Sequence, residues 1–312
     1  MMQGLGLKMK ELRKKKQMTR EALCGDESEL SVRQLARIES GQSNPSLAKA
    51  LFIAKKLGVP LSDFVNPKEL DLPKRYQELK YLILRHPTYM NTDSIEERES
   101  QFDIIFEDYY ADLPEEEQVL IDRLQSRFEV YQSGNSVYGQ DLLLEYIDQI
   151  KKKKTYDLND IFFIDLYLTC GYVSSFKETL FDKGIFECFT SKLILLEEKL
   201  DFKDLFLLNN VLMTAIAVGL TLEEYVKIRT LLNVCRRIMT ITQDFQRMPI
   251  YYMYEWRYTL FHEKDFRKAP YYYQQSLLFA RTHGDEYLKT MIVNAWQEDQ
   301  DKVKTLESQK EI

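Results

Sequence analysis

The stretch SVRQLARIESGQSNPSL, residues 31–47, decides how the first part of this chain folds. Ser31 is a good helix N-cap, and Leu35 and Ile38 lie three residues apart on an apolar stripe that faces inward. Gly41 is placed to end the helix. The stretch therefore predicts a short helix with one buried face, followed by a turn and a second helix.

The outer face of this predicted helix carries Arg33, Gln34 and Arg37. Arginine pairs bidentately with guanine, and glutamine pairs bidentately with adenine. We therefore expect these three side chains to contact base edges of DNA. Polar residues near the ends of the neighbouring helices should contact phosphates instead, and these are Thr19, Arg20, Ser31, Ser43 and Asn44.

Helices are also predicted around this stretch, at residues 5–16, 19–24 and 47–57, which gives a helix-turn-helix within a small all-helical domain. Residues 1–66 hold 12 Lys and Arg against 7 Asp and Glu, a formal charge of +5. The remaining residues hold 31 and 42, a charge of −11. A basic head on an acidic body suits DNA binding by the head alone.

Three segments, in order and at the right spacing, resemble the phage-repressor-like (XRE, Cro/C1-type) helix-turn-helix family: MKELRKKKQMTREAL, SVRQLARIESGQSNPSL and AKKLGVPLSDFV. One departure is CGDESEL, residues 24–30, which lengthens the link between the second and third helices. This insertion, the segment SVRQLARIE and the long helical remainder resemble the Rgg/ComR group of peptide-pheromone receptors in the RNPP family. The resemblance implies promoter DNA and a short imported peptide as partners.

The rest of the chain is predicted to be an all-α, right-handed solenoid of the tetratricopeptide type, because helices of similar length alternate with short turns. We divide the chain into a DNA-binding domain at 1–66, a proline-framed linker at 67–73, a solenoid at 74–300 and a flexible polar tail at 301–312. Helices are expected at 74–86, 94–111, 115–131, 138–153, 159–172, 175–181, 185–199, 203–218, 222–240, 245–262, 266–283 and 286–299.

The best single repeat is DFRKAPYYYQQSLLFA, residues 265–280. Small residues at Ala269, Ser276 and Ala280, with an aromatic residue at Tyr273, are typical of the second helix of a tetratricopeptide unit. A curved array of such units presents an extended concave groove that suits a peptide.

Two adjacent amides, Asn209 and Asn210, interrupt the apolar segment DLFLLNNVLMTAIAVG. One could face solvent while the other hydrogen-bonds a neighbouring helix. Alternatively, one lies on the concave face and clamps a peptide backbone by donating to a carbonyl and accepting from an N–H. Concave-face asparagines do this in the receptors that the sequence resembles, and both interpretations stay open here.

The aromatic run at residues 248–258 makes Tyr251 and Met253 candidates for the pocket wall of a hydrophobic or aromatic peptide. Aromatic residues at helical spacing are more often core, and we expect Trp256 to pack between repeats. Four lysines at 151–154 end a predicted helix, where they complement its dipole; a second DNA contact is the alternative.

Composition excludes several other classes. The N-terminus has no apolar signal region and no stretch approaches a membrane span, so we expect a cytoplasmic protein without a membrane partner. The four cysteines have no paired spacing and are expected to be free thiols, mostly buried. The three histidines are dispersed, and no catalytic, cofactor or metal motif is present, so an enzyme is not expected.

Together these features predict a peptide-responsive transcription regulator. The resemblance implies an activator of competence genes that dimerises on a palindromic promoter once peptide is bound. Alternatives are a regulator, or even a repressor, of another quorum circuit, and a DNA-tethered solenoid scaffold for a folded protein.

Two further expectations concern regulation. Acidic residues of the body could pair with Arg33 or Arg37 and mask the DNA reader, and the candidates are Glu107, Asp108, Glu115, Glu116 and Glu117. An apolar stripe on the last helix could form the dimer contact, or could simply cap the solenoid, and it comprises Leu288, Met291, Ile292, Ala295 and Trp296.

Overall fold

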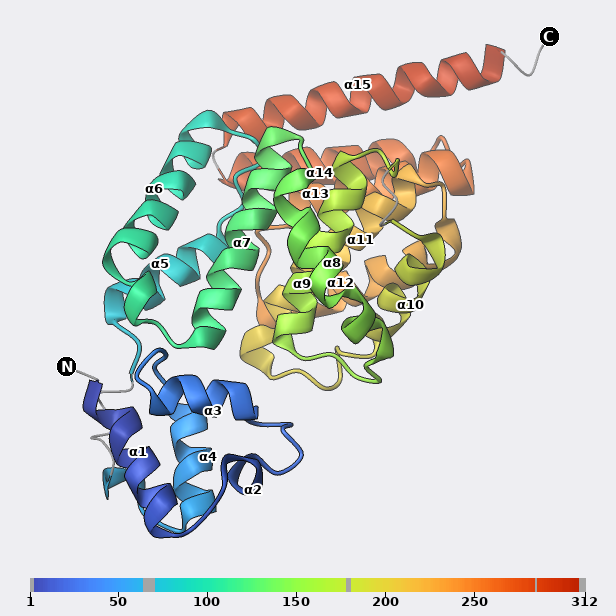
Figure 1. Cartoon of the computed structure of the whole chain (residues 1–312). Coiled ribbons are helices and arrows are strands. Elements are labelled where there is room, and N and C mark those ends of the chain that lie inside the picture. The colour runs from blue at the N-terminus through green and yellow to red at the C-terminus, as the bar shows by residue number, and fades with distance from the viewer. Residues whose placement is uncertain (1–2, 64–70, 178–180, 284, 309–312) are drawn as a thin grey trace. The chain divides into compact units, whose positions relative to one another are not determined.

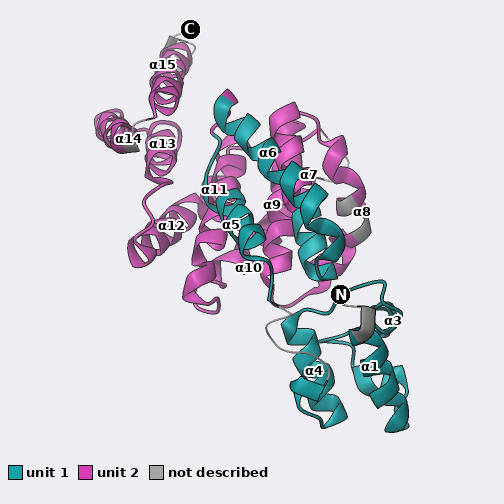
Figure 2. Ribbon diagram, turned by 90° about the vertical axis from the view of Figure 1, so that its left-hand side faces the viewer, with its two compact units in different colours: residues 1–88, 93–122 teal, residues 89–92, 123–312 magenta. Residues whose placement is uncertain are grey.

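The structure is a computed structural model that describes residues 3–63, 71–177, 181–283 and 285–308. Within these ranges the regular secondary structure is helical, as predicted, apart from one isolated bridge. The chain forms two compact units, one of residues 1–88 and 93–122 and the other of residues 89–92 and 123–312 (Figure 2).

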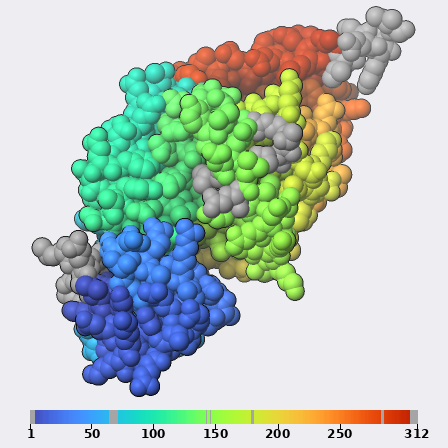
Figure 3. Space-filling view, in the orientation of Figure 1, coloured from blue at the N-terminus to red at the C-terminus, as the bar shows by residue number. Residues whose placement is uncertain are grey.

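The first unit begins with four helices that we call the head, residues 3–63: α1 (Gln3–Lys15), α2 (Arg20–Cys24), α3 (Val32–Glu39) and α4 (Leu47–Leu57). In the space-filling view they form one continuous blue body (Figure 3). Apolar side chains from all four helices fill the core of the head, among them Met9, Leu23, Leu35 and Ile53. The predicted helix-turn-helix is thus present, and α3 is its second helix.

Gly6 allows α1 to lie directly against the end of α3. A Cβ atom at this position would lie 1.8 Å from the carbonyl oxygen of Ile38, which is far inside van der Waals contact. Only glycine fits the space between these two backbones. Gly6 therefore has a packing role.

A buried ion-pair network holds the head together around Glu39. Arg13 donates to both carboxylate oxygens at 2.5 and 2.9 Å, and Arg20 donates at 2.9 Å. Burial acts to raise the pKa of Glu39, but the hydrogen bonds from the two arginines outweigh it and the pKa is lowered. The carboxylate therefore stays ionised inside the head.

The first unit continues with α5 (Lys74–Arg85), α6 (Thr92–Asp108) and the first turns of α7 (Glu115–Ser133). Arg98 of α6 donates to the carbonyl oxygens of Ile83 at 2.8 Å and His86 at 2.6 Å, so it satisfies the end of α5. Most of the predicted linker lies outside the described residues, and its bounds stay a prediction.

The second unit contains the remaining helices, which are α8 (Val137–Lys152), α9 (Leu158–Val173), α10 (Lys183–Ile194), α11 (Leu205–Thr221), α12 (Ile228–Thr242), α13 (Met248–Tyr258), α14 (Ala269–His283) and α15 (Glu286–Ser308). Successive helices pack in pairs, and α13, α14 and α15 lie side by side (Figure 1). The expectation that no stretch approaches a membrane span is wrong by length and composition, because the segment Phe202–Thr221 is long and apolar enough to cross a membrane. Its apolar 18-residue window is 61% buried in the protein, as in the core helix of a soluble protein.

The predicted repeat at residues 265–280 is confirmed in its packing. Ala269, Ser276 and Ala280 are fully buried where α14 meets its neighbours, and the Ser276 hydroxyl donates to the carbonyl oxygen of Pro249 at 2.7 Å. Tyr273 stacks on Trp296 with ring centroids 4.7 Å apart. Small side chains therefore allow close approach of α13 and α14.

Some predicted boundaries are wrong. No helix forms at 175–177, because Ser175 and Phe176 have φ values of +53° and +59° that end α9; residues 178–180 are not described. The helix expected from 222 begins at Ile228, since Glu223 has a φ of +57°. The tail expected to be flexible is helical through Ser308.

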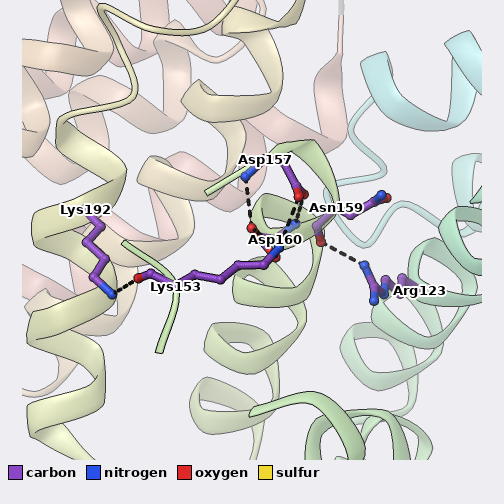
Figure 4. Close-up of polar contacts among 6 residues, drawn as sticks. All are labelled: Arg123, Lys153, Asp157, Asn159, Asp160 and Lys192. Atoms are coloured by element: carbon purple, nitrogen blue, oxygen red, sulfur yellow. Dashed lines mark hydrogen bonds and ion pairs between the residues drawn. The ribbon is translucent and has the colours of Figure 1, made fainter. Parts of the chain in front are cut away.

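The lysine run at residues 151–154 joins two helices (Figure 4). Lys153 donates to Asp160 at 2.7 Å and to Asp157 at 3.1 Å, both in the capping box that begins α9. Lys192 of α10 donates to the carbonyl oxygen of Lys153 at 2.6 Å. These contacts support the structural interpretation of Lys153 over a second DNA contact.

Candidate functional sites

The residues predicted to read bases lie on the outer side of α3. Arg33 is exposed, while Gln34 and Arg37 are half-buried. Gln34 belongs to a capping box: its side-chain oxygen accepts from the backbone N–H of Ser31 at 3.2 Å, and the Ser31 hydroxyl accepts from the backbone N–H of Gln34 at 3.1 Å. In this conformation the Gln34 amide oxygen is engaged and is not presented to an adenine.

Acidic side chains in the first turn of α7 contact the head. The guanidinium of Arg37 lies 3.0 Å from a carboxylate oxygen of Glu115. The ammonium of Lys49 lies 2.9 Å from a carboxylate oxygen of Glu116, which also accepts from the Ser46 hydroxyl at 3.2 Å. One side chain predicted to read bases is thus paired with a carboxylate.

The turn that follows α3 also contacts the segment just before α7. The side-chain amide of Asn44 donates to the carbonyl oxygen of Asp112 at 2.9 Å, and Asn44 forms a backbone bridge with Pro114. Ser43 makes only a weak 3.5 Å contact with the carbonyl oxygen of Asn44. The amide that was predicted to contact a phosphate is therefore occupied by the segment just before α7.

The remaining predicted phosphate contacts have local structural roles as well. The Thr19 hydroxyl caps α2 by accepting from the backbone N–H of Ala22 at 3.1 Å. Arg20 is held by Glu39, and Ser31 caps α3. These roles leave Thr19 exposed and the N-terminus of α2 accessible.

Of the five carboxylates predicted to mask the DNA-reading surface, some contact the head and others do not. Glu117 does not contact the head: it accepts from the Tyr76 hydroxyl at 2.5 Å and from Lys80 at 2.6 Å, both on α5. Glu107 and Asp108 are exposed at the end of α6, and no described head residue pairs with them. Only Glu115 and Glu116 therefore contact the head.

In the second unit, α9 packs against α11, α11 against α13, and α13 against α15. These helices and the end of α7 carry polar and aromatic side chains at helical spacing on one face, which we call the inner face. It comprises Arg127 and Tyr131 of α7, Asp165 and Tyr172 of α9, Phe206, Asn210 and Thr214 of α11, Arg247, Ile250, Tyr254 and Arg257 of α13, and Tyr287 of α15.

Side chains from different helices meet at the inner face. Burial raises the pKa of Tyr131, and the phenol also interacts electrostatically with Arg127, Tyr172, Arg247 and Tyr287. The side chain of Tyr131 is nevertheless 39% exposed. The Tyr131 phenol thus has protein groups from several helices around it and is still reached by solvent.

Polar contacts connect three helices on this face. Arg127 forms an ion pair with Asp165, and the Thr214 hydroxyl donates to Asp165 at 2.8 Å. The same hydroxyl lies 3.3 Å from the carbonyl oxygen of Asn210. The buried Asp165 carboxylate therefore has a cationic partner and a hydroxyl partner.

The two asparagines of α11 differ in their surroundings. Asn209 is 4% exposed, and its side-chain oxygen is buried with no hydrogen-bond partner among the described residues. Asn210 is half-buried and lies one helical turn from Thr214, on the inner face. The geometry thus separates the two amides that the sequence left equivalent.

Tyr251 and Met253 are not on the inner face. Tyr251 is 1% exposed and its hydroxyl donates to Glu255 at 2.6 Å, while Met253 is packed in the core formed with α14 and α15. The prediction that they line the pocket is wrong because the inner face of α13 follows a different stripe, through Ile250 and Tyr254. The aromatic run at residues 248–258 does not by itself indicate which side of the helix faces inward.

The apolar stripe of α15 is part of the core. Leu288 and Ile292 are fully buried, Ala295 is buried, and Met291 and Trp296 pack against the same cluster of α13 and α14. Trp256 donates to Asp299 at 2.9 Å, which confirms its packing role. The predicted dimer surface is therefore occupied within the chain, and the capping alternative describes it.

Metal and thiol chemistry add no site. In the part of the chain that the structure describes, no group of three or more His, Cys, Asp or Glu could hold a metal ion. The four cysteines are free, with Cys24, Cys170 and Cys235 buried and Cys188 exposed.

Comparison with protein families identifies both parts of the chain. A helix-turn-helix family model matches residues 9–64, and a model described as the ComR tetratricopeptide matches residues 73–296. The chain belongs to the ComR family. This is a family of DNA-binding, peptide-sensing regulators of transcription rather than of enzymes.

Solved structures agree with this assignment. ComR from Streptococcus suis is 36% identical, with a TM-score of 0.73, and the match covers 95% of each chain. ComR from S. thermophilus in its apo form is 27% identical over 96% of this chain and 100% of that one, with a TM-score of 0.74. The S. thermophilus complex with DNA and its signalling peptide ComS is 28% identical over 95% and 99%, with a TM-score of 0.68. A comparison with curated proteins finds no match.

Proposed function

We propose that this ComR-family protein is a cytoplasmic activator of competence genes that is switched on by a short imported peptide. Its S. thermophilus relative was solved with both DNA and a signalling peptide, which supports the same two partners here. The observation that carries the proposal is the ion pair between Arg37 of the reading helix and Glu115 at the start of α7. This contact couples DNA reading to the body of the protein.

We interpret the contacts of Glu115 and Glu116 as a mask over the reading surface. Arg37 cannot donate to a guanine while it is paired with Glu115, and Asn44 cannot reach a phosphate while it donates to Asp112. Lys49 is equally engaged with Glu116. The free protein would therefore bind DNA poorly until these contacts open.

Opening requires a ligand that binds the unmasked state more tightly than the masked one. The shift cannot exceed the difference between these two affinities, so the mask must be worth only a few kcal/mol. Two ion pairs and two hydrogen bonds at partly exposed positions are of that order. A mask much stronger than this would never be released by a short peptide.

For the peptide, we propose the inner face as the binding surface and Asn210 as the backbone clamp. An amide on this face can donate to a peptide carbonyl and accept from a peptide N–H, whatever the side chains of the peptide are. Asn209 has a buried oxygen without a described donor, so a rearrangement that brings a donor to it would also be favourable. Both asparagines therefore stay candidates for peptide recognition.

Dimerisation on a palindromic promoter is proposed by analogy with the two-fold symmetry of such sites. The α15 stripe is buried in its own chain, so a partner subunit in this conformation would have to contact another surface.

The test is to add peptide fractions from the culture medium of the native host to the purified protein. Binding to a duplex selected from a random pool is followed by fluorescence anisotropy, and mass is followed by light scattering. We expect one fraction to increase DNA affinity and to produce a dimer. DNA affinity that no fraction changes would contradict the proposal.

A further inference from the structure

Arg247 is a half-buried cation of the inner face with an aromatic rather than an acidic environment. It is the N-cap residue of α13. Tyr89 donates to the carbonyl oxygen of the adjacent Gln246 at 3.1 Å, and its phenol oxygen also interacts with the Arg247 side chain. Tyr131 and Tyr254 are within electrostatic range of the same guanidinium.

The other arginines of this face have carboxylate partners. Arg127 pairs with Asp165, and Arg257 lies 2.7 Å from Asp299. Across the described ranges, by contrast, no carboxylate forms an ion pair with Arg247. A partly desolvated guanidinium gains substantially from a charge-assisted bond with a carboxylate, so this position is suited to one that comes from a ligand.

Asp285, whose charge acts on the neighbouring Tyr89, is not an ion-pair partner of Arg247. The charge of Asp285 reaches the phenol of Tyr89, but its side chain accepts from the backbone N–H of Leu288 at 2.9 Å. Asp285 thus caps the start of α15, where a carboxylate also complements the helix dipole.

Three exposed aromatic side chains lie near the cation: Tyr131 interacts with Arg247 itself, and Tyr172 and Tyr287 interact with Tyr131. Tyr131, Tyr172 and Tyr287 are 39%, 42% and 42% exposed, although large aromatic side chains are usually well buried. Each offers an apolar ring face and a hydroxyl to a ligand. A cation among half-exposed phenols is typical of a site for a small ligand with an anionic end and an apolar body.

We propose that Arg247 binds a carboxylate of the peptide, while Tyr131, Tyr172 and Tyr287 pack against the residues next to that carboxylate. The inference rests on the proposed function. The carboxylate is either the free C-terminus of the peptide or an acidic side chain. Because Asn210 lies on α11 and α11 packs against α13, the backbone clamp and the charge anchor occupy neighbouring helices.

This arrangement solves a problem that a backbone clamp alone leaves open. An asparagine that hydrogen-bonds any peptide backbone does not fix the register or direction of the peptide. One charged anchor fixes both. Arg247 would therefore determine which end of the peptide lies near the start of α13.

The experiment uses three pools of random octapeptides with the full-length protein. One pool lacks Asp and Glu and has a free C-terminal carboxylate, the second is the same pool as C-terminal amides, and the third is amidated and contains Asp and Glu. Peptides that co-elute with the protein in size-exclusion chromatography are quantified by mass spectrometry. The proteins are the wild type, Arg247→Gln, Arg247→Lys and, as a matched charge control, Arg267→Gln at an exposed position.

We expect the wild type and Arg267→Gln to retain a pool with a carboxylate roughly 10- to 100-fold better than the neutral amidated pool. Arg247→Gln should lose this preference, and Arg247→Lys should keep part of it. Retention of the first pool identifies the C-terminal carboxylate as the group that binds Arg247. Retention of the third pool identifies an acidic side chain instead.

Two results would overturn the inference. Equal retention of acidic and neutral pools by the wild type shows that no carboxylate is recognised, and an undiminished preference in Arg247→Gln places the anchor elsewhere. If the wild type retains no pool at all, the peptide-receptor proposal fails together with its subsite. Thermal unfolding of each variant, followed by circular dichroism, shows that the comparison is made between folded proteins.

Discussion

Neutralising Glu115 and Glu116 together should make DNA binding independent of peptide. In the double variant Glu115→Gln/Glu116→Gln the side chains keep their size and an acceptor oxygen but lose both charges. The two ion pairs that they form with the head, at 3.0 and 2.9 Å, are then reduced to hydrogen bonds between a cation and an uncharged amide. The DNA-reading side chains themselves are unchanged, which a substitution of Arg37 would not achieve.

The magnitude follows from the exposure of the pairs. The Arg37 and Glu115 side chains are 35% and 25% exposed, so their pair is worth about 0.2 to 1 kcal/mol. The Lys49 side chain is only 11% exposed. Its ion pair with Glu116 therefore contributes more free energy than an ion pair at the surface. A combined loss of about 1 to 3 kcal/mol would shift the equilibrium between masked and open heads by about 5- to 150-fold.

The assay is fluorescence anisotropy with a labelled duplex that the double variant selects from a random pool, measured without peptide at fixed ionic strength. The matched control is Glu107→Gln/Asp108→Asn, which removes the same two charges from α6, where no described head residue pairs with them. We expect the first variant to bind more tightly than the wild type by the factor above, and the control to change little.

Equal gains in both double variants would mean that net charge, and not the contact with the head, limits DNA binding. Unchanged affinity in a folded Glu115→Gln/Glu116→Gln protein would refute the mask.

Three other changes test the head and the inner face. Gly6→Ala should lower the stability of the head by about 1 to 3 kcal/mol in urea unfolding, because the new Cβ meets the Ile38 carbonyl, and this outweighs a helix-propensity gain of about 1 kcal/mol. Glu39→Gln should cost about 3 to 5 kcal/mol at pH 7, since Arg13 is left buried without its partner. The pKa of Glu39 is lowered in the folded state, so its contribution is complete above its ordinary value of 4.5 and is lost as pH falls; the two unfolding curves should converge in acid. Asn210→Ala should weaken peptide binding, measured by calorimetry, by about 1 to 3 kcal/mol, with no comparable loss of thermal stability. Wild-type affinity would exclude Asn210 as the clamp.

The head was predictable from the sequence because its signals are local. The N-cap, the two inward residues and Gly41 occupy one short segment, and each acts on its immediate neighbours. The capping box formed by Ser31 and Gln34 was also readable from its spacing, yet Gln34 was assigned to base contact instead. A side chain that suits DNA can equally suit the helix that carries it.

The inner face was less predictable because helix phase depends on packing between distant segments. On α13, Tyr251 and Tyr254 are equivalent in composition, but only Tyr254 lies on the inner face. The same uncertainty applied to Asn209 and Asn210, which point about 100° apart on one helix. A bulky helix that is apolar on most sides gives no amphipathic signal from which the phase could be read.

One helix carries residues of both proposed sites, and this leads to a last prediction. α7 begins with Glu115 and Glu116, which contact the head, and its final turns carry Arg127 and Tyr131 of the inner face. A continuous helix can transmit a displacement from one end to the other, whereas a softened one transmits less. Gln125→Gly/Ser126→Gly should cost about 1 kcal/mol of helix propensity per residue, while Gln125→Ala/Ser126→Ala keeps the helix intact. We expect the glycine variant to bind peptide but to release its DNA-binding head less completely, measured as a smaller peptide-induced gain in DNA affinity than in the alanine control. An identical gain in both variants would show that the signal does not pass along α7.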